Sequence, residues 1–295
     1  MNLKDLDYFC QLAHTLSFTQ TATYFGVSQP TITQALKRLE QRFQLPLLER
    51  KQHSKSIQLT PAGHQLMLTS EQMLSAWESS VAAIGRMREA KVRLGIGPSI
   101  SERYLIALMR TMRQANVLSN LEIVEMGAKA LAQQLTDGAV DLVITGVLDD
   151  NPDPNLQTVP LTPLHFNVLA NTDHPLTNKT SVTVNELVKY PFITLNSDYL
   201  NHEVFTRMFG GATPKVLFDS ENPRVVLQAI SADIALGFLA DLTPIDDPAI
   251  RILPIVDVAP LSAQIALQYR RNQQHSALFD TIITIIQQQF SHNHQ

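Results

Sequence analysis

Apolar residues between positions 3 and 43 recur every three or four positions, the spacing that gives a helix one buried face. The pattern predicts helices over Leu3–Leu16 and Phe18–Phe25 and a third helix after Ser28. Ser17 can cap the second helix, and Gly26 can end it because glycine adopts a positive φ without a Cβ clash. The inward positions of the first and third helices are Leu6, Phe9, Cys10, Ala13, Leu16, Ile32, Leu36, Leu39 and Phe43. Together they predict a small helical domain with its own core.

Two more elements follow these helices. Residues 47–60 hold two short apolar stretches around a polar turn, the pattern of a β-hairpin or wing. From Pro61 to about Arg88 the composition is helical, with no internal proline. Two sets of residues recur there every seven positions, with one polar exception: Met67, Leu74 and Val81, and Ser70, Trp77 and Ile84. This seam predicts a long helix that pairs with its copy, and packing on its own domain is the alternative.

The polar side of the third helix carries the side chains that read DNA in other proteins. Glutamine can bond adenine at two points, threonine can bond a base or touch a thymine methyl, and lysine and arginine reach guanine or phosphate. A helix tip of this kind after a tight turn can enter the major groove, whereas the alternative is a solvated polar face. The predicted DNA-binding residues are Ser28, Gln29, Pro30, Thr31, Thr33, Gln34, Lys37 and Arg38 in the helix, with Arg50, Lys51 and Lys55 in the wing.

From residue 91 onward, short apolar runs alternate with helical patterns. Val92, Leu94 and Ile96 begin the series, and residues 121–126 and 141–146 continue it. Strands that alternate with helices predict right-handed βαβ units and a mainly parallel sheet. Helices at 102–114 and 128–135 separate these strands. A similar series follows, with strands predicted at 165–170, 191–195, 215–218, 234–240 and 263–268 and helices at 199–208, 223–231 and 276–290. The pattern predicts two α/β lobes with a cleft between them.

Ligands of such lobes bind at the carboxyl ends of parallel strands and at helix N-termini, where free N–H groups favour an anion. The predicted effector-binding residues are Ser99, Ile100, Ser101, Thr145 and Gly146 in the first lobe and Thr194, Leu195 and Asn196 in the second. For each serine, threonine or asparagine, a cap or turn role is the alternative. A small organic acid is the favoured effector. His165 and His202 could add a positive partner, or could be surface or packing residues.

Charge and composition support DNA binding and give little sign of an enzyme. The chain of 295 residues has a net charge of −4, yet residues 1–60 hold seven lysines and arginines against four acids, a net of +3. The start lacks a signal-peptide pattern, no apolar run is long enough to span a membrane, and the single cysteine, Cys10, suits a buried position in a reducing cytoplasm. Dinucleotide, P-loop, nucleophile-elbow, CxxC and HExxH motifs are absent from the sequence, so neither a cofactor nor a metal is expected.

Several short motifs occur together across the first sixty-five residues. They are Ser17-Phe18-Thr19, Val27-Ser28-Gln29-Pro30, Leu39-Glu40, Leu47-Leu48, Arg50 and Leu59-Thr60-Pro61-Ala62-Gly63. In this order they resemble the winged helix-turn-helix signature of the LysR-type transcriptional regulators. Thr21 stands where the family commonly has alanine, Leu48 where phenylalanine is usual, and the wing is about two residues longer. The later α/β pattern is similar to the effector-binding portion of that family, itself similar to type 2 periplasmic solute-binding proteins.

The resemblance implies a ligand-responsive bacterial regulator with an all-α winged helix-turn-helix over residues 1–60, a dimerising linker helix over 61–90 and an α/β effector-binding domain over 91–295. Lobe I is expected at about 91–161 and 263–295, and lobe II at about 162–262. The family usually assembles as a homotetramer, a dimer of dimers on promoter DNA. The other hypothesis is a solute-binding or small-molecule enzyme domain with an incidental N-terminal helical module.

Overall fold

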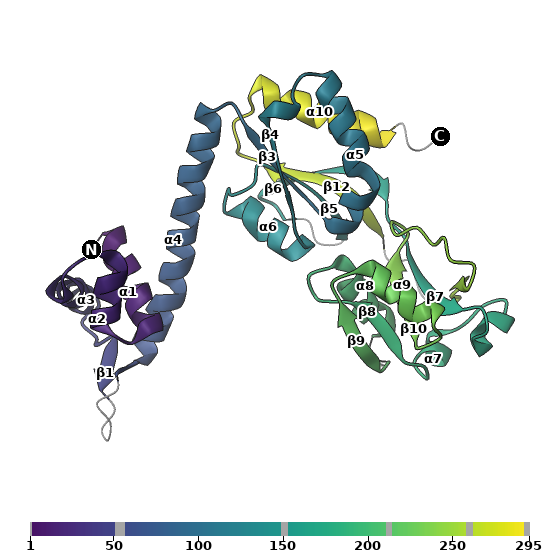
Figure 1. Ribbon diagram of the computed structural model, residues 1–295, viewed down its shortest axis with the longest axis horizontal. Coiled ribbons are helices and arrows are strands. Elements are labelled where there is room, and N and C mark those ends of the chain that lie inside the picture. Colours follow the sequence, from purple (N-terminus) through teal and green to yellow (C-terminus); the bar gives the residue numbers. More distant parts are fainter. Residues whose placement is uncertain (1, 51–56, 149–152, 211–213, 258–261, 292–295) are drawn as a thin grey trace. The chain divides into compact units, whose positions relative to one another are not determined.

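The computed structural model describes residues 2–50, 57–148, 153–210, 214–257 and 262–291 (Figure 1). The chain divides into two compact units, residues 1–82 and 83–295, which are described in turn. The dividing point lies within one long helix, α4 (Pro61–Arg88).

The first unit is a three-helix domain with a two-stranded wing. Its elements are α1 (Leu3–Thr15), α2 (Phe18–Phe25), α3 (Gln29–Phe43), β1 (Leu48–Arg50), β2 (Ile57–Leu59) and the first part of α4. The two wing strands pair antiparallel, with Leu48 opposite Leu59. Side chains from α1 and α3, among them Phe9 and Leu39, form the core, and Leu66 and Met67 of α4 pack against it. The predicted helices and wing are therefore confirmed.

Local signals explain where these helices begin and end. Asn2 and Asp5 form a capping box at the start of α1, the Ser17 side chain accepts a hydrogen bond from the backbone of Gln20, and Gly26 ends α2 with φ of 63°. Two predicted inward positions are exposed instead. Leu16, 39% exposed, is the C-cap of α1 in a left-handed conformation, and Phe43, 43% exposed, is the last residue of α3. Ser28 occupies the N-cap of α3, but its hydroxyl lies 2.9 Å from that of Thr31 and makes no cap bond to the backbone.

The second unit contains two α/β lobes, each built on a five-stranded sheet (Figure 1). Lobe I comprises β3 (Val92–Ile96), α5 (Pro98–Gln114), the 3₁₀ helix η1 (Leu118–Asn120), β4 (Leu121–Glu125), α6 (Ala128–Thr136), β5 (Leu142–Leu148), β6 (Leu156–Pro163), β12 (Ala263–Arg270) and α10 (Ala277–Ser291). Its strand order is β4-β3-β5-β12-β6. Helices α5 and α10 pack together on the main core of this lobe, around Leu108 and Ile282.

Lobe II has the same plan. It comprises β7 (Phe166–Asn171), the 3₁₀ helix η2 (Pro175–Asn178), α7 (Val184–Leu187), β8 (Phe192–Leu195), α8 (Leu200–Phe209), β9 (Val216–Ser220), α9 (Pro223–Ser231), β10 (Leu236–Ala240) and β11 (Ile250–Leu253). Its strand order is β11-β7-β10-β8-β9. An aromatic cluster of Phe192, Phe205, Phe209 and Phe238 fills one side of the sheet.

The expectation of a mainly parallel sheet was wrong. In each lobe two strand pairings are parallel and two are antiparallel. Two of the antiparallel strands, β6 and β11, were not predicted, and both lie at sheet edges. Strand β6 contains Pro160 and Pro163, and proline is tolerated in a sheet at an edge because no neighbour needs its missing N–H. With β6 included, the lobe I sheet extends to Pro163. Helix α5 also begins earlier than predicted, at Pro98 rather than at Glu102.

Helix α4 is divided between two environments. Met67 packs against the helical core and Ser70 is fully buried, so the start of the predicted heptad seam faces its own domain. Farther along, Trp77, Val81 and Ile84 are 55%, 52% and 66% exposed. Among the described residues, no helix is long and apolar enough to cross a bilayer.

Candidate functional site

The N-terminal part of α3 presents a polar surface on the first unit. Gln29, Pro30 and Gln34 are exposed, as is Lys37 one turn later. Ile32, Ala35, Leu36 and Leu39 are buried on the opposite side. Packing on the buried face of the helix thus holds the polar groups at fixed positions. No side chain caps the N-terminus of α3, so its first backbone N–H groups have no side-chain partner. Such an end, which carries partial positive charge, suits a phosphate or a base edge.

Thr31 and Thr33 are half-buried beside this surface. The Thr33 hydroxyl donates to the backbone oxygen of Gln29 at 3.2 Å, and the Thr31 hydroxyl is shared with Ser28. Their hydroxyls are already partnered within the helix, although their methyl groups remain available for apolar contact with a base. The glutamines are therefore the most accessible hydrogen-bonding groups of the predicted set on this turn.

Arg38, predicted to contact DNA, forms an ion pair with Asp5 of its own domain. Its Nη2 lies 2.5 Å from Oδ1 of Asp5 and its Nε donates to Oδ2 at 3.2 Å. The Asp5 side chain is only 2% exposed, whereas that of Arg38 is 47% exposed. The hydrogen bond from Arg38 lowers the pKa of Asp5 below its ordinary value, against burial, which raises it. Arg38 fixes α3 on α1 and is a weaker candidate for reading bases.

The wing residues of the prediction cannot be placed in the same way. Arg50 ends β1, and its side chain lies outside the described residues. Lys51 and Lys55 also lie outside them.

A cleft of about 600 Å³ opens between the two lobes of the second unit. We call it the main cleft. Lobe I contributes the end of β5 with Thr145 and Gly146, the exposed side of α6, and two glutamines of β12; lobe II contributes the start of α8. Its polar and charged lining residues are Lys129, Thr136, Thr145, Asp153, Thr158, Ser197, Asp198, Tyr199, His202, Glu203, Arg207, Gln264 and Gln268.

An inner cavity of about 50 Å³ adjoins the main cleft and is largely apolar. The two share Ala128, Thr145, Gly146, Tyr199 and Leu200. Apolar lining is completed by side chains that include Ile100, Leu164, Ala240 and Leu242, and the polar lining residues are Ser99, Thr145, Tyr199 and Asn201. A site with apolar walls and a few polar groups is the usual form of a small-molecule pocket.

Asn201 is an unusual residue of the inner cavity. Its side chain is 6% exposed, and its amide Nδ2 has no hydrogen-bond partner among the described residues. The neighbouring His202, which lines the main cleft, likewise has its Nδ1 buried without a partner there. A buried donor without a partner costs about 1–3 kcal/mol, so a ligand that accepts a hydrogen bond from Asn201 would offset that cost.

The first residues of three helices also line the inner cavity. Pro98 of α5, Ala128 of α6 and Leu200 of α8 all line the inner cavity. The N-cap residues of these helices are Gly97, Gly127 and Tyr199, and none of the three supplies a side-chain cap bond. Uncapped helix N-termini that converge on one cavity favour a bound anion or hydrogen-bond acceptor.

The lobes meet closely at one edge of the cleft. The backbone N–H of Ala128 donates to the backbone oxygen of Asp198 at 2.9 Å. A Cβ on Gly127 would lie 2.8 Å from the Cβ of Asp198, so a larger residue would force the lobes apart at this point.

On the other side, a second cleft of about 350 Å³ is acidic. Glu102, Glu125 and Glu221 line it together with Ser99 and Ser101, and Arg224 pairs with Glu102 at 2.5 Å. Tyr199 separates this acidic cleft from the main cleft, and its hydroxyl donates to the backbone oxygen of Glu221 at 2.7 Å. Burial raises the pKa of Tyr199 above its ordinary value, helped by the negative charge of Glu221.

The predicted effector residues divide by lobe. Ser99, Ile100, Ser101, Thr145 and Gly146 of lobe I all line at least one of the three spaces. The lobe II residues do not: Thr194 and Leu195 are each 1% exposed within the sheet, and Asn196 bonds toward Glu221. Strand β8 ends at Leu195, and the chain runs on to Tyr199 before α8 begins. The wall of the cleft is therefore made by Tyr199, Leu200 and Asn201, which strand-end reasoning missed.

The two histidines named from the sequence also differ. His202 lines the main cleft, whereas His165 is exposed and pairs with Asp241, with Nδ1 and Oδ2 3.1 Å apart.

A winged helix-turn-helix joined through a long helix to a two-lobed domain with an interlobe cleft defines a DNA-binding regulator that responds to a ligand. Residues 3–64 match the family described as bacterial regulatory helix-turn-helix protein, lysR family, and residues 85–291 match the LysR substrate binding domain. The chain belongs to the LysR family of transcriptional regulators.

Relatives and solved structures agree with this assignment. The malolactic fermentation system transcriptional activator of Lactococcus lactis subsp. lactis (strain IL1403) is 27% identical over 249 residues, which are 84% of each chain. The structure of full-length CbnR complexed with its target DNA matches with a TM-score of 0.62 and 17% identity, over 98% of this chain and all of that one. The effector binding domain of QuiR in complex with shikimate matches with a TM-score of 0.58 and 14% identity, over 68% of this chain and 97% of that one. At these identities the two structures show the fold. The named relative is a regulator, and the enzyme alternative is set aside.

Proposed function

We propose that this regulator binds promoter DNA through the N-terminal face of α3 and changes that binding when a small organic acid occupies the main cleft and inner cavity. On this proposal residues 1–60 bind DNA, residues 61–90 dimerise and residues 91–295 bind the effector in the bacterial cytoplasm. Lobe I then takes in about 91–161 and 263–295, and lobe II about 162–262. Two dimers can join as a homotetramer on an extended operator.

The exposed face of α3 supports the DNA assignment. Gln29 and Gln34 are both exposed and stand five residues, about 1.4 turns, apart on a helix whose buried side packs in the core. Lys37 can reach a phosphate from the next turn. An ordinary solvated surface would not explain why this part of the helix carries amides and hydroxyls in place of the acids and lysines that usually face water.

The exposed part of α4 supports dimerisation. Trp77, Val81 and Ile84 follow one another at intervals of four and three along the helix, and each is more than half exposed. A monomer rarely leaves such a stripe of large apolar side chains in water, whereas a second copy of the helix would cover it. A two-fold dimer would present two α3 helices to a two-fold operator.

The inner cavity supports an acid as the effector, and Asn201 is the observation that carries this part of the proposal. Its unpartnered Nδ2 can donate to a carboxylate or hydroxyl oxygen, and the three uncapped helix N-termini favour negative charge at the same place. The glutamates of the acidic cleft disfavour a second negative charge on that side. The favoured ligand carries one carboxylate at the helix ends and a compact apolar or hydroxylated body.

A ligand panel measured by calorimetric titration of the full chain tests this proposal. The probes are shikimate, benzoate and L-malate as acids, glucose as a neutral compound and putrescine as a cation. We expect an acid to bind and the cation not to bind. Asn201→Ala should weaken acid binding about tenfold or more without lowering the melting temperature of the ligand-free protein, because Nδ2 has no partner to lose there.

Asn185→Ala, an exposed asparagine on α7, is the matched control and should leave binding unchanged. Ser99→Ala is expected to remove the effector response and leave DNA binding intact. Binding of putrescine in preference to every acid, or acid binding that is unaffected by Asn201→Ala, would contradict the assignment of the ligand.

A further inference from the structure

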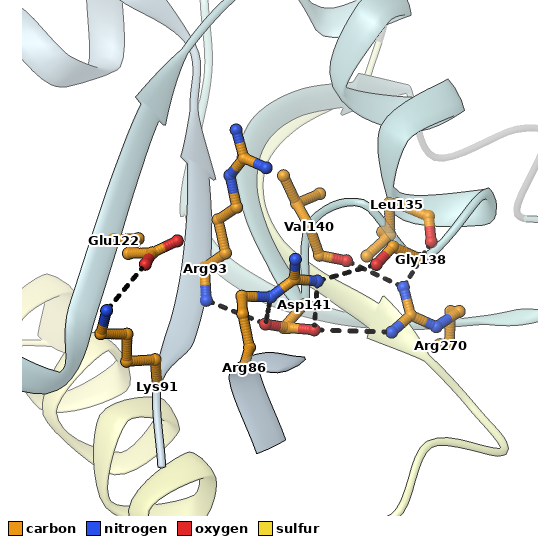
Figure 2. Close-up of polar contacts among 9 residues, drawn as sticks. All are labelled: Arg86, Lys91, Arg93, Glu122, Leu135, Gly138, Val140, Asp141 and Arg270. Atoms are coloured by element: carbon orange, nitrogen blue, oxygen red, sulfur yellow. Dashed lines mark hydrogen bonds and ion pairs between the residues drawn. The ribbon is translucent and has the colours of Figure 1, made fainter. Parts of the chain in front are cut away.

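The C-terminal turn of α4 is attached to lobe I by a buried ion pair (Figure 2). Arg86 donates from Nε to Oδ2 of Asp141 at 3.1 Å and from Nη2 to Oδ1 at 3.3 Å, and Nη2 also donates to the backbone oxygen of Gly138 at 2.8 Å. The side chains of Arg86 and Asp141 are 7% and 10% exposed. Both residues belong to the second unit.

A second arginine completes the cluster. Nη2 of Arg270 lies 3.8 Å from Oδ1 of Asp141, and its Nη1 donates to the backbone oxygens of Leu135 and Val140 at 2.6 and 2.8 Å (Figure 2). Asp141 accepts a further bond from the backbone N–H of Arg93 at 2.9 Å. We call Arg86, Asp141 and Arg270 the α4 joint.

The joint places two cations on one carboxylate, so it holds one positive charge in excess. Carbonyl oxygens of the segment between α6 and β5, at Gly138 and Val140, and of the last turn of α6, at Leu135, offset that charge. The C-terminal end of a helix carries partial negative charge, which adds to the compensation. Charges that are paired and hydrogen-bonded in this way are costly to separate, so the joint resists bending.

Nearby contacts attach the residues that directly follow α4 at two more points. The side chain of Asn120 donates to the backbone oxygen of Ala90 at 3.0 Å, and Nζ of Lys91 lies 3.4 Å from a carboxylate oxygen of Glu122. One residue before Arg86, in contrast, stands Gly85, where a Cβ would meet nothing within 4 Å. Glycine inside a helix lowers its stability by about 1 kcal/mol relative to alanine, so α4 has a weak position directly before its attached turn.

Three elements run from the joint to the walls of the main cleft. Strand β5 begins one residue after Asp141 and reaches the cleft at Thr145. Helix α6 lines the cleft from Ala128 onward and ends beside the joint. Strand β12 lines the cleft at Gln264 and Gln268 and ends at Arg270.

We propose that the α4 joint is the coupling point of this regulator. The joint makes the last turn of α4, from Arg86 onward, part of lobe I, so that this turn moves with the walls of the main cleft. The rest of α4 then bends relative to it at Gly85. This inference rests on the proposed function, in which a ligand biases the arrangement of the DNA-binding domains. A ligand that binds one arrangement of the walls better than another shifts the population of α4 directions with it.

Spin-label distance measurements on the full-length protein test the joint without any ligand. The labels are placed at exposed positions on either side of it, Ala82→Cys and Gln114→Cys, in a Cys10→Ser background and with excess unlabelled chain. We expect Arg86→Met, which keeps the apolar stem and removes the charge, to broaden the distance distribution roughly twofold because the turn is no longer held. Arg86→Lys should recover part of the narrow distribution, and Gly85→Ala should narrow it further.

Arg88→Gln, an exposed arginine on the same turn, is the matched control and should change nothing. If the Arg86→Met protein does not fold, the Gly85→Ala protein still tests the joint, because the open space at Gly85 accepts a methyl group. Distributions that stay the same width in Arg86→Met, or in Gly85→Ala when the former does not fold, overturn the joint. Specific DNA binding by the same wild-type protein then shows that the proposed function stands without it.

Discussion

In the N-terminal part of α3, Gln29 and Gln34 combine exposure with the ability to read a base at two points. The hydroxyls of Thr31 and Thr33 bond within the helix, and Arg38 bonds to Asp5. Residue type alone named all of these as candidates, and only their neighbours in space separate the proposed base-reading residues from those that bond within the protein. The pair of Asp5 and Arg38, 33 positions apart in the sequence, leaves no local signal from which it could be predicted.

Gln29→Ala tests the reader assignment. We expect it to weaken binding to the preferred DNA by about 1–3 kcal/mol while binding to random duplex stays nearly the same, because base contacts carry specificity and phosphate contacts do not. Fluorescence anisotropy with both duplexes measures this. Gln41→Ala, an exposed glutamine near the other end of α3, is the control. An equal loss on every duplex would show that Gln29 contributes no base contact.

The pH dependence of the first unit tests the support assignment. Because the pKa of Asp5 is lowered in the folded protein, its stabilising effect is complete above the ordinary aspartate pKa of about 3.9 and is lost as the pH falls through the folded value. Hydrogen exchange of the amides in α1 and α3 should therefore be faster in Asp5→Asn than in wild type at neutral pH, and the difference should disappear in acid. A difference that grows on acidification would contradict the sign of the shift.

Elements with strong local signals were predicted closely. Helices α2, α4 and α9 have the predicted bounds because capping residues, glycine or proline stand at one or both ends of each. Strands β6 and β11 were missed because edge strands tolerate proline and need only short apolar runs. The lobe II wall of the cleft was misplaced by several residues, since a turn separates the end of β8 from the start of α8. Element identity thus followed from local pattern, whereas the site depended on where a turn placed the next helix.

Trp77→Glu tests the dimer assignment of α4. A charge at the first position of the exposed apolar stripe should weaken self-association about tenfold or more, because pairing would bury it without a partner. Sedimentation equilibrium of the full chain measures the change. Ser75→Glu adds the same charge two positions earlier, on a different face of the helix, and should leave the association unchanged. Equal association in all three proteins would remove α4 from the interface.

The whole molecule combines a DNA-reading unit and a ligand-binding unit through one helix. The alternation of strands and helices predicted the two lobes, and the N-terminal motifs predicted the family to which the chain belongs. The mixed sheets and the α4 joint could not be predicted, because both depend on contacts between segments far apart: Arg86 and Asp141 are 55 positions apart. Ligand response in such a protein is a shift between arrangements and requires that the effector bind one of them better.

Competition binding of the purified full-length protein to fragments of its own genome tests the central claim most directly. We expect at least one fragment to bind roughly a thousandfold tighter than random duplex at about 0.15 M salt. The logarithm of its binding constant should fall linearly as the logarithm of the salt concentration rises. Equal affinity for every fragment and for random duplex, with or without the panel of acids, would contradict the account.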